Sequence, residues 1–368
     1  MKGLAVLGST GVVGSLALEV VRDYPKDFKI ISLVGRRDSK KLRDQVREFK
    51  PKIVVATEKD GEEAMIKAVE HSEVDLVVVA VVGMAGLRPI LAAIKAGKDV
   101  ALATKEVLVV AGEIVMREAE KYGVNLIPLD SEHSAIWQSL KSGKEKEIKR
   151  VYLTMGKGRL SEMKKEELKK IKLKDVLKRK TWVMGQKIGV DSATCMNKAF
   201  EIVEAKWLFG LKSEQIKIVV HPEYLCHSLV EFVDGSWITE LGIANMKRYV
   251  QYGLFYPERR EIKRMDEMEL IERNLSFEKP PMEKFLGLKL GYQAIEKEGT
   301  MPAVMHGADG VVVEFFAKGK LGFMEMTEII KQVMDNHKVI KKPDLRQVIK
   351  AEKWGGERAK ELIKRRER

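Results

Sequence analysis

Cysteine and long apolar runs are scarce in this chain of 368 residues. Its two cysteines, Cys195 and Cys226, lie in segments with the pattern of buried structure, which argues against a disulfide framework. The longest apolar run, 76–87, contains two glycines and stops short of the roughly 20 residues that span a bilayer. The first predicted strand begins within a few residues of Met1, so no signal peptide is expected. We therefore expect a cytoplasmic protein with no membrane association.

Acidic residues are outnumbered, and the formal net charge is +13. Such a charge suits nucleic acid, anionic membranes or anionic small molecules. The basic excess is concentrated in Lys164–Lys180 and Arg358–Arg368, where no aromatic residues interleave with the charges to form a stacking surface. Solvated helical surface explains these stretches better, so no nucleic-acid partner is expected. A nucleic-acid-binding protein that has lost its catalysis stays as the weaker alternative.

The order of apolar segments in the first part of the chain predicts an α/β fold. Short apolar runs alternate with helical patterns, and strands are predicted at Leu4–Leu7, Phe28–Val34, Ile53–Ala56, Leu76–Ala80, Asp99–Leu102 and Asn125–Pro128. Such alternation is typical of a doubly wound, mostly parallel sheet with helices on both faces. We therefore predict an N-terminal Rossmann-like domain over residues 1–142.

The length of the chain leaves room for further domains. Strands are predicted at Val151–Met155, Ile216–Val220, Ser228–Val233 and Ser236–Leu241. Together with the helical segments between them, they indicate an α+β domain over residues 143–279. Helical patterns follow at Leu286–Glu298, Gly310–Lys318 and Met324–His337. They predict a small C-terminal helical domain over residues 280–368.

Three glycines, Gly8, Gly11 and Gly14, follow the first predicted strand and open the first helix. A glycine turn in this place lets backbone N–H groups face a diphosphate, and the helix N-terminus favours negative charge. The spacing G-x-x-G-x-x-G differs from the commoner G-x-G-x-x-G, but its position between strand and helix favours a dinucleotide site. The alternative is a tight turn that binds nothing.

The end of the second predicted strand indicates which dinucleotide binds. An acidic residue there would hold the ribose diol of NADH. The chain instead has Gly35, Arg36 and Arg37, and the two arginines suit a 2′-phosphate, so NADPH is preferred. Asp38 stays as an alternative diol ligand if the turn is displaced by two residues.

Two polar clusters follow predicted strands near the end of the first domain. One contains Lys105 and Glu106, and the other contains Asp130 and Glu132. Open α/β sheets bind ligands at the carboxyl ends of their strands. In an extended chain Asp130 and Glu132 point the same way and, with Glu201, offer three oxygen ligands to Mg²⁺ or Mn²⁺. Read alone, the Asp-Ser-Glu sequence is more often a helix N-cap.

A further polar set lies near the middle of the chain. If this segment is helical, Asn197, Glu201 and Glu204 share one face. Lys198 then meets Glu201 at i+3. Ser192 comes before this helix, in a predicted loop. An amide, an ammonium group and two carboxylates beside an apolar stripe indicate a ligand-facing helix rather than a solvated surface.

In their order along the chain, these motifs resemble those of the 1-deoxy-D-xylulose 5-phosphate reductoisomerase family. The resemblance covers nearly the whole chain. It rests on Gly8-Ser9-Thr10-Gly11, Lys105-Glu106, Asp130–Ala135, Trp182–Gly185, Asp191–Glu204, His221-Pro222, His227-Ser228, Val230–Ser236 and Gln251–Arg259. It implies an NADPH-binding domain, a catalytic and dimerisation domain with a mobile lid near residues 156–185, and a homodimer.

The resemblance also implies roles for individual residues. The implied metal ligands are Asp130, Glu132 and Glu201, with Glu204 as a supporting carboxylate. The implied catalytic residues are Lys105, Glu132 and Glu201. The implied contacts to the sugar phosphate are Lys105, Ser131, Glu132, Gly156, Arg179, Trp182, Ser192, Asn197, Lys198 and Glu201. The implied contacts to NADPH are Gly8, Thr10, Gly11, Val12, Val13, Gly35, Arg36, Arg37, Thr104, Glu106 and Gly185.

Several positions depart from the family's usual pattern. Gly156 stands where a phosphate-binding serine is usual, and the charge of Lys157 or Arg159 is one possible replacement. Arg179 takes the place of a lid histidine, and Thr104 that of an asparagine. The usual Asn-Ala-Ala-Asn-Glu run reads His-Gly-Ala-Asp-Gly at 306–310. These changes leave the expected metal and hydride chemistry intact.

The implied activity is the rearrangement and reduction of 1-deoxy-D-xylulose 5-phosphate to 2-C-methyl-D-erythritol 4-phosphate. NADPH and a divalent metal are the implied cofactors, and a small phosphorylated sugar is the partner. The alternative enzyme is another NADPH-linked dehydrogenase, of the homoserine dehydrogenase type. The three carboxylates and the predicted phosphate contacts argue against that alternative.

Overall fold

The structure, a computed structural model, describes residues 1–178 and 185–366. Contacts within the chain define two compact units. Unit 1 comprises residues 1–107, 113–137 and 245–269, and unit 2 comprises 108–112, 138–244 and 270–368. The boundaries proposed for three domains stay a prediction.

Unit 1 is built on a six-stranded parallel sheet with the order β3-β2-β1-β4-β5-β6. Its strands are β1 (Lys2–Leu7), β2 (Phe28–Gly35), β3 (Ile53–Ala56), β4 (Leu76–Val79), β5 (Asp99–Leu102) and β6 (Leu126–Pro128). All six lie within two residues of their predicted positions. The chain builds the sheet outward in one direction from β1 to β3 and in the other direction from β4 to β6. Open α/β sheets bind ligands at such a reversal of strand order, outside the carboxyl ends of the strands.

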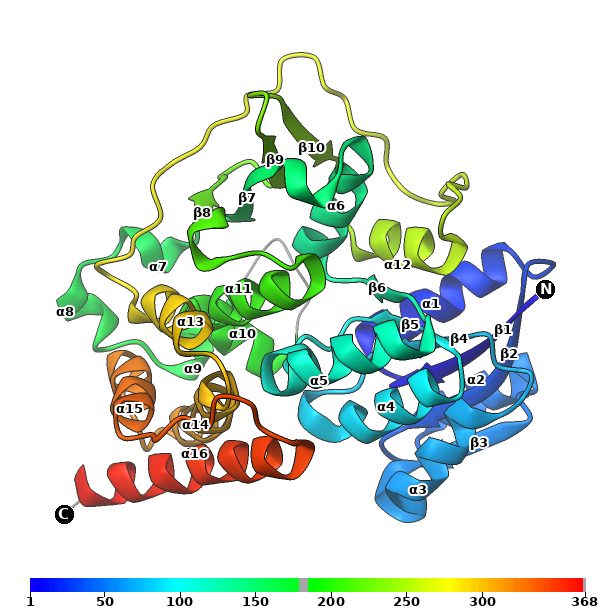
Figure 1. The fold of residues 1–368 in the computed structure, drawn as a ribbon, viewed down its shortest axis with the longest axis horizontal. Helices are drawn as coiled ribbons and strands as arrows, with labels where there is room; N and C mark the ends of the chain where they lie inside the picture. The colour runs from blue at the N-terminus through cyan, green and yellow to red at the C-terminus, as the bar shows by residue number, and fades with distance from the viewer. Residues whose placement is uncertain (179–184, 367–368) are drawn as a thin grey trace. The chain divides into compact units, whose positions relative to one another are not determined.

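Helices connect these strands. Those that begin in unit 1 are α1 (Val12–Asp23), α2 (Lys40–Phe49), α3 (Thr57–Glu70), α4 (Leu87–Lys95), α5 (Glu106–Tyr122), α6 (Ser131–Ser139) and α12 (Met246–Phe255). Helix α12 packs beside α1, although more than 200 residues separate them in the chain (Figure 1). Leu254 joins the cluster that contains Leu4, and Lys247 donates to Asp23 Oδ2 at 2.9 Å. The first unit therefore includes a segment far from the N-terminus.

Unit 2 contains a second, smaller sheet with the order β10-β9-β7-β8. Its strands are β7 (Ile148–Met155), β8 (Ile216–Val220), β9 (Cys226–Phe232) and β10 (Trp237–Leu241). Strands β7 and β8 are parallel, so their carboxyl ends meet at one edge, whereas β9 and β10 join as an antiparallel hairpin. The predicted mixture of helices and a small sheet is present.

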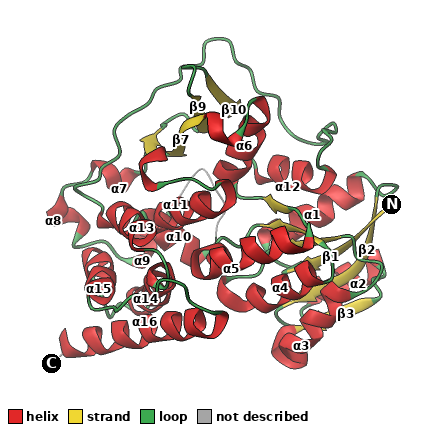
Figure 2. Ribbon diagram, in the orientation of Figure 1, coloured by secondary structure: helices red, strands yellow, loops and turns green. Residues whose placement is uncertain are grey.

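Helices make up most of the rest of unit 2 (Figure 2). They are α7 (Arg159–Glu162), α8 (Lys165–Leu168), α9 (Leu173–Val176), α10 (Gln186–Ala193), α11 (Met196–Phe209), α13 (Leu286–Lys297), α14 (Met301–Ala317), α15 (Phe323–Asp335) and α16 (Leu345–Arg366). Within the described ranges, no helix combines the length and the apolar composition that a membrane span requires.

The predicted start of α14 at Gly310 is wrong, because the helix begins at Met301. Residues 301–309 are all buried, so they lack the polar stripe by which a surface helix is recognised. The position of α13 agrees with the sequence to within one residue, and that of α15 to within two. Helix α16, which packs against α14, had no predicted bounds.

Candidate active site

The glycine turn between β1 and α1 is closed by backbone contacts. Gly8 has a φ of +83°, and a Cβ atom there would lie 2.4 Å from the carbonyl oxygen of Ala80. A Cβ atom on Gly14 would lie 2.3 Å from the carbonyl oxygen of Gly8. Gly11 is the N-cap of α1 and has no side chain to cap the first-turn N–H groups. The turn therefore brings bare backbone to the helix N-terminus, as a diphosphate requires.

The remaining diphosphate contacts implied by the resemblance lie in the same turn. Thr10 is half-buried at its tip, and its carbonyl oxygen accepts a 2.9 Å hydrogen bond from Lys41. Val12 is exposed and Val13 is half-buried, and they begin α1. The turn thus gathers the predicted diphosphate contacts at one helix end.

Arg36 and Arg37 follow β2 and share one carboxylate. Their Nε atoms donate to the two oxygens of Glu58, each at 2.8 Å. The hydrogen bond from Arg37 is the largest of the effects that lower the pKa of Glu58. Asp38, the alternative diol ligand, pairs instead with Arg43 at 3.0 Å. The carboxyl end of β2 therefore carries two guanidinium groups, which the Glu58 carboxylate holds in place.

Sequence reasoning missed Glu58. It comes two residues after β3, the neighbour of β2, and its N–H donates to the carbonyl oxygen of Arg36. Since parallel strands end at one edge, the position of Glu58 near the arginines could have been predicted from the strand order.

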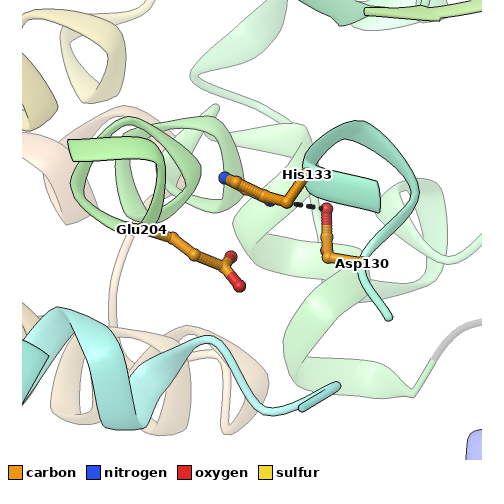
Figure 3. A group of neighbouring side chains, drawn as sticks. All are labelled: Asp130, His133 and Glu204. Carbon is orange, nitrogen blue, oxygen red and sulfur yellow. Dashed lines mark hydrogen bonds and ion pairs between the residues drawn. The ribbon is translucent and has the colours of Figure 1, made fainter. Parts of the chain in front are cut away.

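Asp130, between β6 and α6, is held by two basic side chains. Lys105 Nζ lies 2.7 Å from its Oδ2, and His133 Nδ1 lies 3.1 Å from its Oδ1. Burial raises the pKa of Asp130, but the charge of Lys105 and the contact with His133 outweigh it and hold the pKa well below its ordinary value. Figure 3 draws the His133–Asp130 contact, together with Glu204 of α11. Asp130 is therefore an ionised carboxylate.

The expected extended conformation after Asp130 is wrong. Helix α6 begins at Ser131, so Glu132 lies in its first turn. There the helix N-terminus favours a negative charge. The Ser131 hydroxyl donates to Glu132 Oε2 at 2.5 Å. The alternative interpretation of Asp-Ser-Glu as a helix start is therefore correct. The Asp130 side chain contacts Lys105 and His133.

The cluster after β5 is buried. Thr104, Lys105 and Glu106 are each at most 9% exposed. The Thr104 hydroxyl donates to the carbonyl oxygen of Val81, and Glu106 is the first residue of α5. These side chains lie at the carboxyl end of β5, where the sequence places them.

The polar segment of unit 2 consists of two helices rather than a loop and a helix. Cys195 has a φ of +63° and separates α10 from α11. Ser192, expected in a loop, lies in the last turn of α10 and donates to the carbonyl oxygen of Ile188 at 2.8 Å. Helix α11 therefore has an N-terminus of its own, which begins at Met196.

Glu201 accepts hydrogen bonds from both predicted neighbours. Asn197 Nδ2 donates to Oε1 at 2.5 Å, and Lys198 Nζ donates to Oε2. Lys198 also donates to the carbonyl oxygen of Thr154 at 2.5 Å. The side chains of Lys198 and Glu201 are 6% and 2% exposed, and Glu204 is buried one turn further on. The predicted pairings at i+3 and i+4 are present.

Other predicted contacts to the substrate and cofactor lie near the ends of the segment 156–185. Gly156 directly follows β7, and Gly185 is the exposed N-cap of α10. Arg179 and Trp182 lie outside the described residues. Gly35 is the buried last residue of β2.

The donor types suit a hard divalent cation. Unit 1 supplies the carboxylates Asp130 and Glu132, and unit 2 supplies Glu201 and Glu204. The imidazole of His133, in unit 1, is a further donor of a type that metal sites use. Oxygen-rich sets of this kind match Mg²⁺ and Mn²⁺ better than softer metals.

Models of one protein family match most of the chain. The model described as 1-deoxy-D-xylulose 5-phosphate reductoisomerase matches residues 4–61 and 56–112. Models of the C-terminal domains of the same enzyme match residues 126–209 and 241–358.

Curated relatives cover nearly the whole chain. The 1-deoxy-D-xylulose 5-phosphate reductoisomerase of Caldanaerobacter subterraneus subsp. tengcongensis is 42% identical over 367 residues, which cover 95% of this chain and 96% of the relative. That of Thermoanaerobacter pseudethanolicus is 41% identical, and the match covers 96% of this chain and 97% of the relative.

Solved structures of the enzyme share the fold. The reductoisomerase of Zymomonas mobilis in complex with NADPH has a TM-score of 0.91 at 29% identity, with 98% of this chain and 99% of that chain covered. A DOX-P reductoisomerase in complex with NADPH, fosmidomycin and magnesium has a TM-score of 0.91 at 33% identity, and both chains are covered completely. The predicted fold class and enzyme class are therefore confirmed. The chain belongs to the 1-deoxy-D-xylulose 5-phosphate reductoisomerase family.

Proposed function

We propose that this protein converts 1-deoxy-D-xylulose 5-phosphate to 2-C-methyl-D-erythritol 4-phosphate by rearrangement and NADPH-dependent reduction, with a divalent metal. The observation that carries the proposal is the sequence identity of 41–42% to curated reductoisomerases over nearly the whole chain. Homologous structures hold NADPH and magnesium, which match the two cofactors. The residues of both units fit these groups chemically.

NADPH binds unit 1 through backbone and arginine contacts. The diphosphate lies on the turn formed by Gly8, Thr10, Gly11, Val12 and Val13. Arg36 and Arg37, beside Gly35, bind the 2′-phosphate, because a bidentate guanidinium suits phosphate geometry. Thr104, Glu106 and Gly185 lie toward the nicotinamide in this proposal. NADPH supplies the hydride.

Asp130, Glu132 and Glu201 hold the divalent cation in this proposal. When bound, Mg²⁺ or Mn²⁺ supplies positive charge that stabilises negative oxygens of the substrate. Lys105 keeps Asp130 ionised and brings its own positive charge to the reacting end of the sugar, beside Ser131. Asn197 and Lys198 orient the Glu201 carboxylate, whose two oxygens they contact.

The substrate phosphate binds unit 2. Ser192, Asn197 and Lys198 offer a hydroxyl, an amide and an ammonium group from the ends of α10 and α11. Arg179 and Trp182 belong to a lid, near residues 156–185, that excludes water while the reactive aldehyde is reduced. Gly156 marks the start of that segment.

A homodimer in the cytoplasm completes the proposal. Strand β10 is the edge of the smaller sheet, and its Trp237 is 50% exposed, a combination that suits pairing with a second copy. Cys195 and Cys226 are both buried thiols, as cysteines are in a reducing compartment.

The decisive test follows NADPH absorbance with 1-deoxy-D-xylulose 5-phosphate and purified protein. We expect oxidation of NADPH that needs Mg²⁺ or Mn²⁺ and stops when EDTA is added. Product analysis should give 2-C-methyl-D-erythritol 4-phosphate. Oxidation of NADPH with an unphosphorylated substrate such as aspartate semialdehyde, and none with the sugar phosphate, would contradict the proposal.

A further inference from the structure

Gly156 lies directly against the side chain of Tyr224. A Cβ atom on Gly156 would meet the ring at 1.8 Å from Cζ and 2.0 Å from the phenol oxygen. No side chain larger than hydrogen fits there while the ring keeps its place. The hydroxyl end of Tyr224 therefore occupies the space that a side chain at position 156 would fill.

The backbone of Tyr224 is strained to place the ring there. Its φ is +56°, in the left-handed region that a bulky residue rarely adopts. The turn is held by His221, whose Nε2 accepts the N–H of Leu225 at 3.1 Å. The imidazole proton is then on Nδ1, which donates to the carbonyl oxygen of Ser276 at 2.9 Å. Strain that neighbouring contacts maintain in this way is a feature of ligand sites.

Tyr224 comes to the edge of the sheet where Lys198 already lies. Strands β7 and β8 are parallel, and the N–H of His221 donates to the carbonyl oxygen of Met155, which extends their pairing past the end of β8. Lys198 Nζ contacts the carbonyl oxygen of Thr154, two residues before Gly156. Two residues of a strand span about 7 Å. A phosphate group with hydrogen bonds on both sides has the size to bridge this distance.

The charged residues beside Gly156 are engaged elsewhere. Lys157 Nζ pairs with Glu278 at 3.0 Å, and this hydrogen bond is the main cause of its raised pKa. Arg159 donates to the carbonyl oxygen of Asp175 at 3.4 Å. The Tyr224 side chain, in contrast, places its phenol oxygen at the position of Gly156.

We propose that the Tyr224 hydroxyl donates a hydrogen bond to the substrate phosphate and replaces the hydroxyl that a serine at position 156 would supply. This inference rests on the proposed function and names a ligand of the same phosphate subsite. Gly156 and Tyr224 then depend on each other. The glycine leaves space for the ring, and the ring places a hydrogen-bond donor in that space.

Tyr224→Phe tests the hydroxyl alone, with Tyr122→Phe, an exposed phenol of α5, as the matched control. A hydrogen bond to a charged group predicts a rise of about tenfold in KM for the sugar phosphate. Inhibition by inorganic phosphate should weaken by a similar factor, while kcat and the Kd of NADPH change less than about threefold. Unchanged KM and unchanged phosphate inhibition in Tyr224→Phe would overturn the inference. Absence of turnover in the wild-type protein would instead overturn the proposed function.

A second pair of variants tests the exchange of positions. Gly156→Ser should displace the ring and raise KM, because its Cβ atom has no room. Tyr224→Ser should raise KM because the hydroxyl no longer reaches. The double variant Gly156→Ser/Tyr224→Ser should recover most of the wild-type KM. A double variant as impaired as the two single effects combined would show that a serine at position 156 does not replace the Tyr224 hydroxyl, which would contradict the inference.

Discussion

The two proposed phosphate sites of this molecule are built in opposite ways. In unit 1 the turn after β1 is backbone, closed so tightly that Gly8 and Gly14 have no room for a Cβ atom. In unit 2 the donors are side chains, among them Lys198 and Asn197 on α11 and, as we propose, Tyr224 on the turn after β8. The first site offers backbone groups to the phosphate, and the second offers side chains.

This difference decides how each site tolerates change. A backbone site has one solution, since any side chain on Gly8 meets the main chain at Ala80. A side-chain site can move a donor from one position to another, as the pair of Gly156 and Tyr224 indicates. We expect a single substitution in the glycine turn to cause a large loss of affinity for its ligand, and a single substitution in the side-chain site to cause a smaller loss.

The largest expected effect comes from Glu201→Gln, which alters a proposed metal ligand. Turnover should fall by about a thousandfold or more, because a bound cation stabilises substrate charge by several kcal/mol. The Kd of NADPH, measured by fluorescence, should stay within about twofold. Since Lys198 loses its charged partner, a melting curve is needed to show that the variant is folded. Full activity in a folded variant would refute the metal assignment.

Gly8→Ala should break the backbone site. Its φ of +83° and the contact with Ala80 predict a loss of about 1–3 kcal/mol in stability and a rise of about a hundredfold in the Kd of NADPH. Gly97→Ala is the matched control, because Gly97 has a φ of +71° and nothing within 4 Å of its Cβ position. Binding of inorganic phosphate should be unaffected in both variants. Equal NADPH affinity in the two variants would contradict the close-approach argument.

The cofactor preference offers a smaller effect. Replacing Arg36 and Arg37 together by Gln should lower the preference for NADPH over NADH by about tenfold, since both guanidinium groups are exposed and partly screened. The ratio of kcat/KM for the two cofactors measures this preference. The KM of the sugar phosphate should not change. A preference that survives the double substitution would place the 2′-phosphate elsewhere.

Ser192→Ala should give the smallest effect. Its hydroxyl already donates to the carbonyl oxygen of Ile188, so the substitution removes only a hydroxyl hydrogen that the phosphate would share with that carbonyl. We expect the KM of the sugar phosphate to rise about fivefold, the value of one ordinary hydrogen bond. A rise as large as that in Tyr224→Phe would show that the side-chain site depends on Ser192 more than we propose.

Much of the fold could be predicted because local patterns mark its elements. The six strands of the larger sheet are short apolar runs bounded by turns, and they occur where the sequence places them. Helix α14 could not be delimited, because residues 301–309 are buried on every side. The return of α12 to unit 1 also has no local signal, since it depends on packing against α1. Long-range packing is what sequence patterns do not encode.

The candidate site divides along the same line. The glycine turn and the spacing of Asn197, Lys198 and Glu201 are local, so the sequence predicts them. The hydrogen bond from Lys198 to Thr154 and the place of Tyr224 depend on distant segments that meet in the folded chain. The prediction of a loop at Ser192 was wrong, because a single residue in the left-handed conformation, Cys195, is enough to separate the two helices.

The late arrival of α12 has a consequence for synthesis of the protein. Leu254 and Phe255 complete the cluster around Leu4, so the N-terminal part of unit 1 leaves the ribosome before its core is complete. Residues 138–244 must be translated before that gap closes, which takes roughly 5–20 seconds at ordinary elongation rates. During this interval the apolar residues of unit 1 that pack against α12 lack their partner. Unit 1 therefore completes its core only after the central part of the chain has been made.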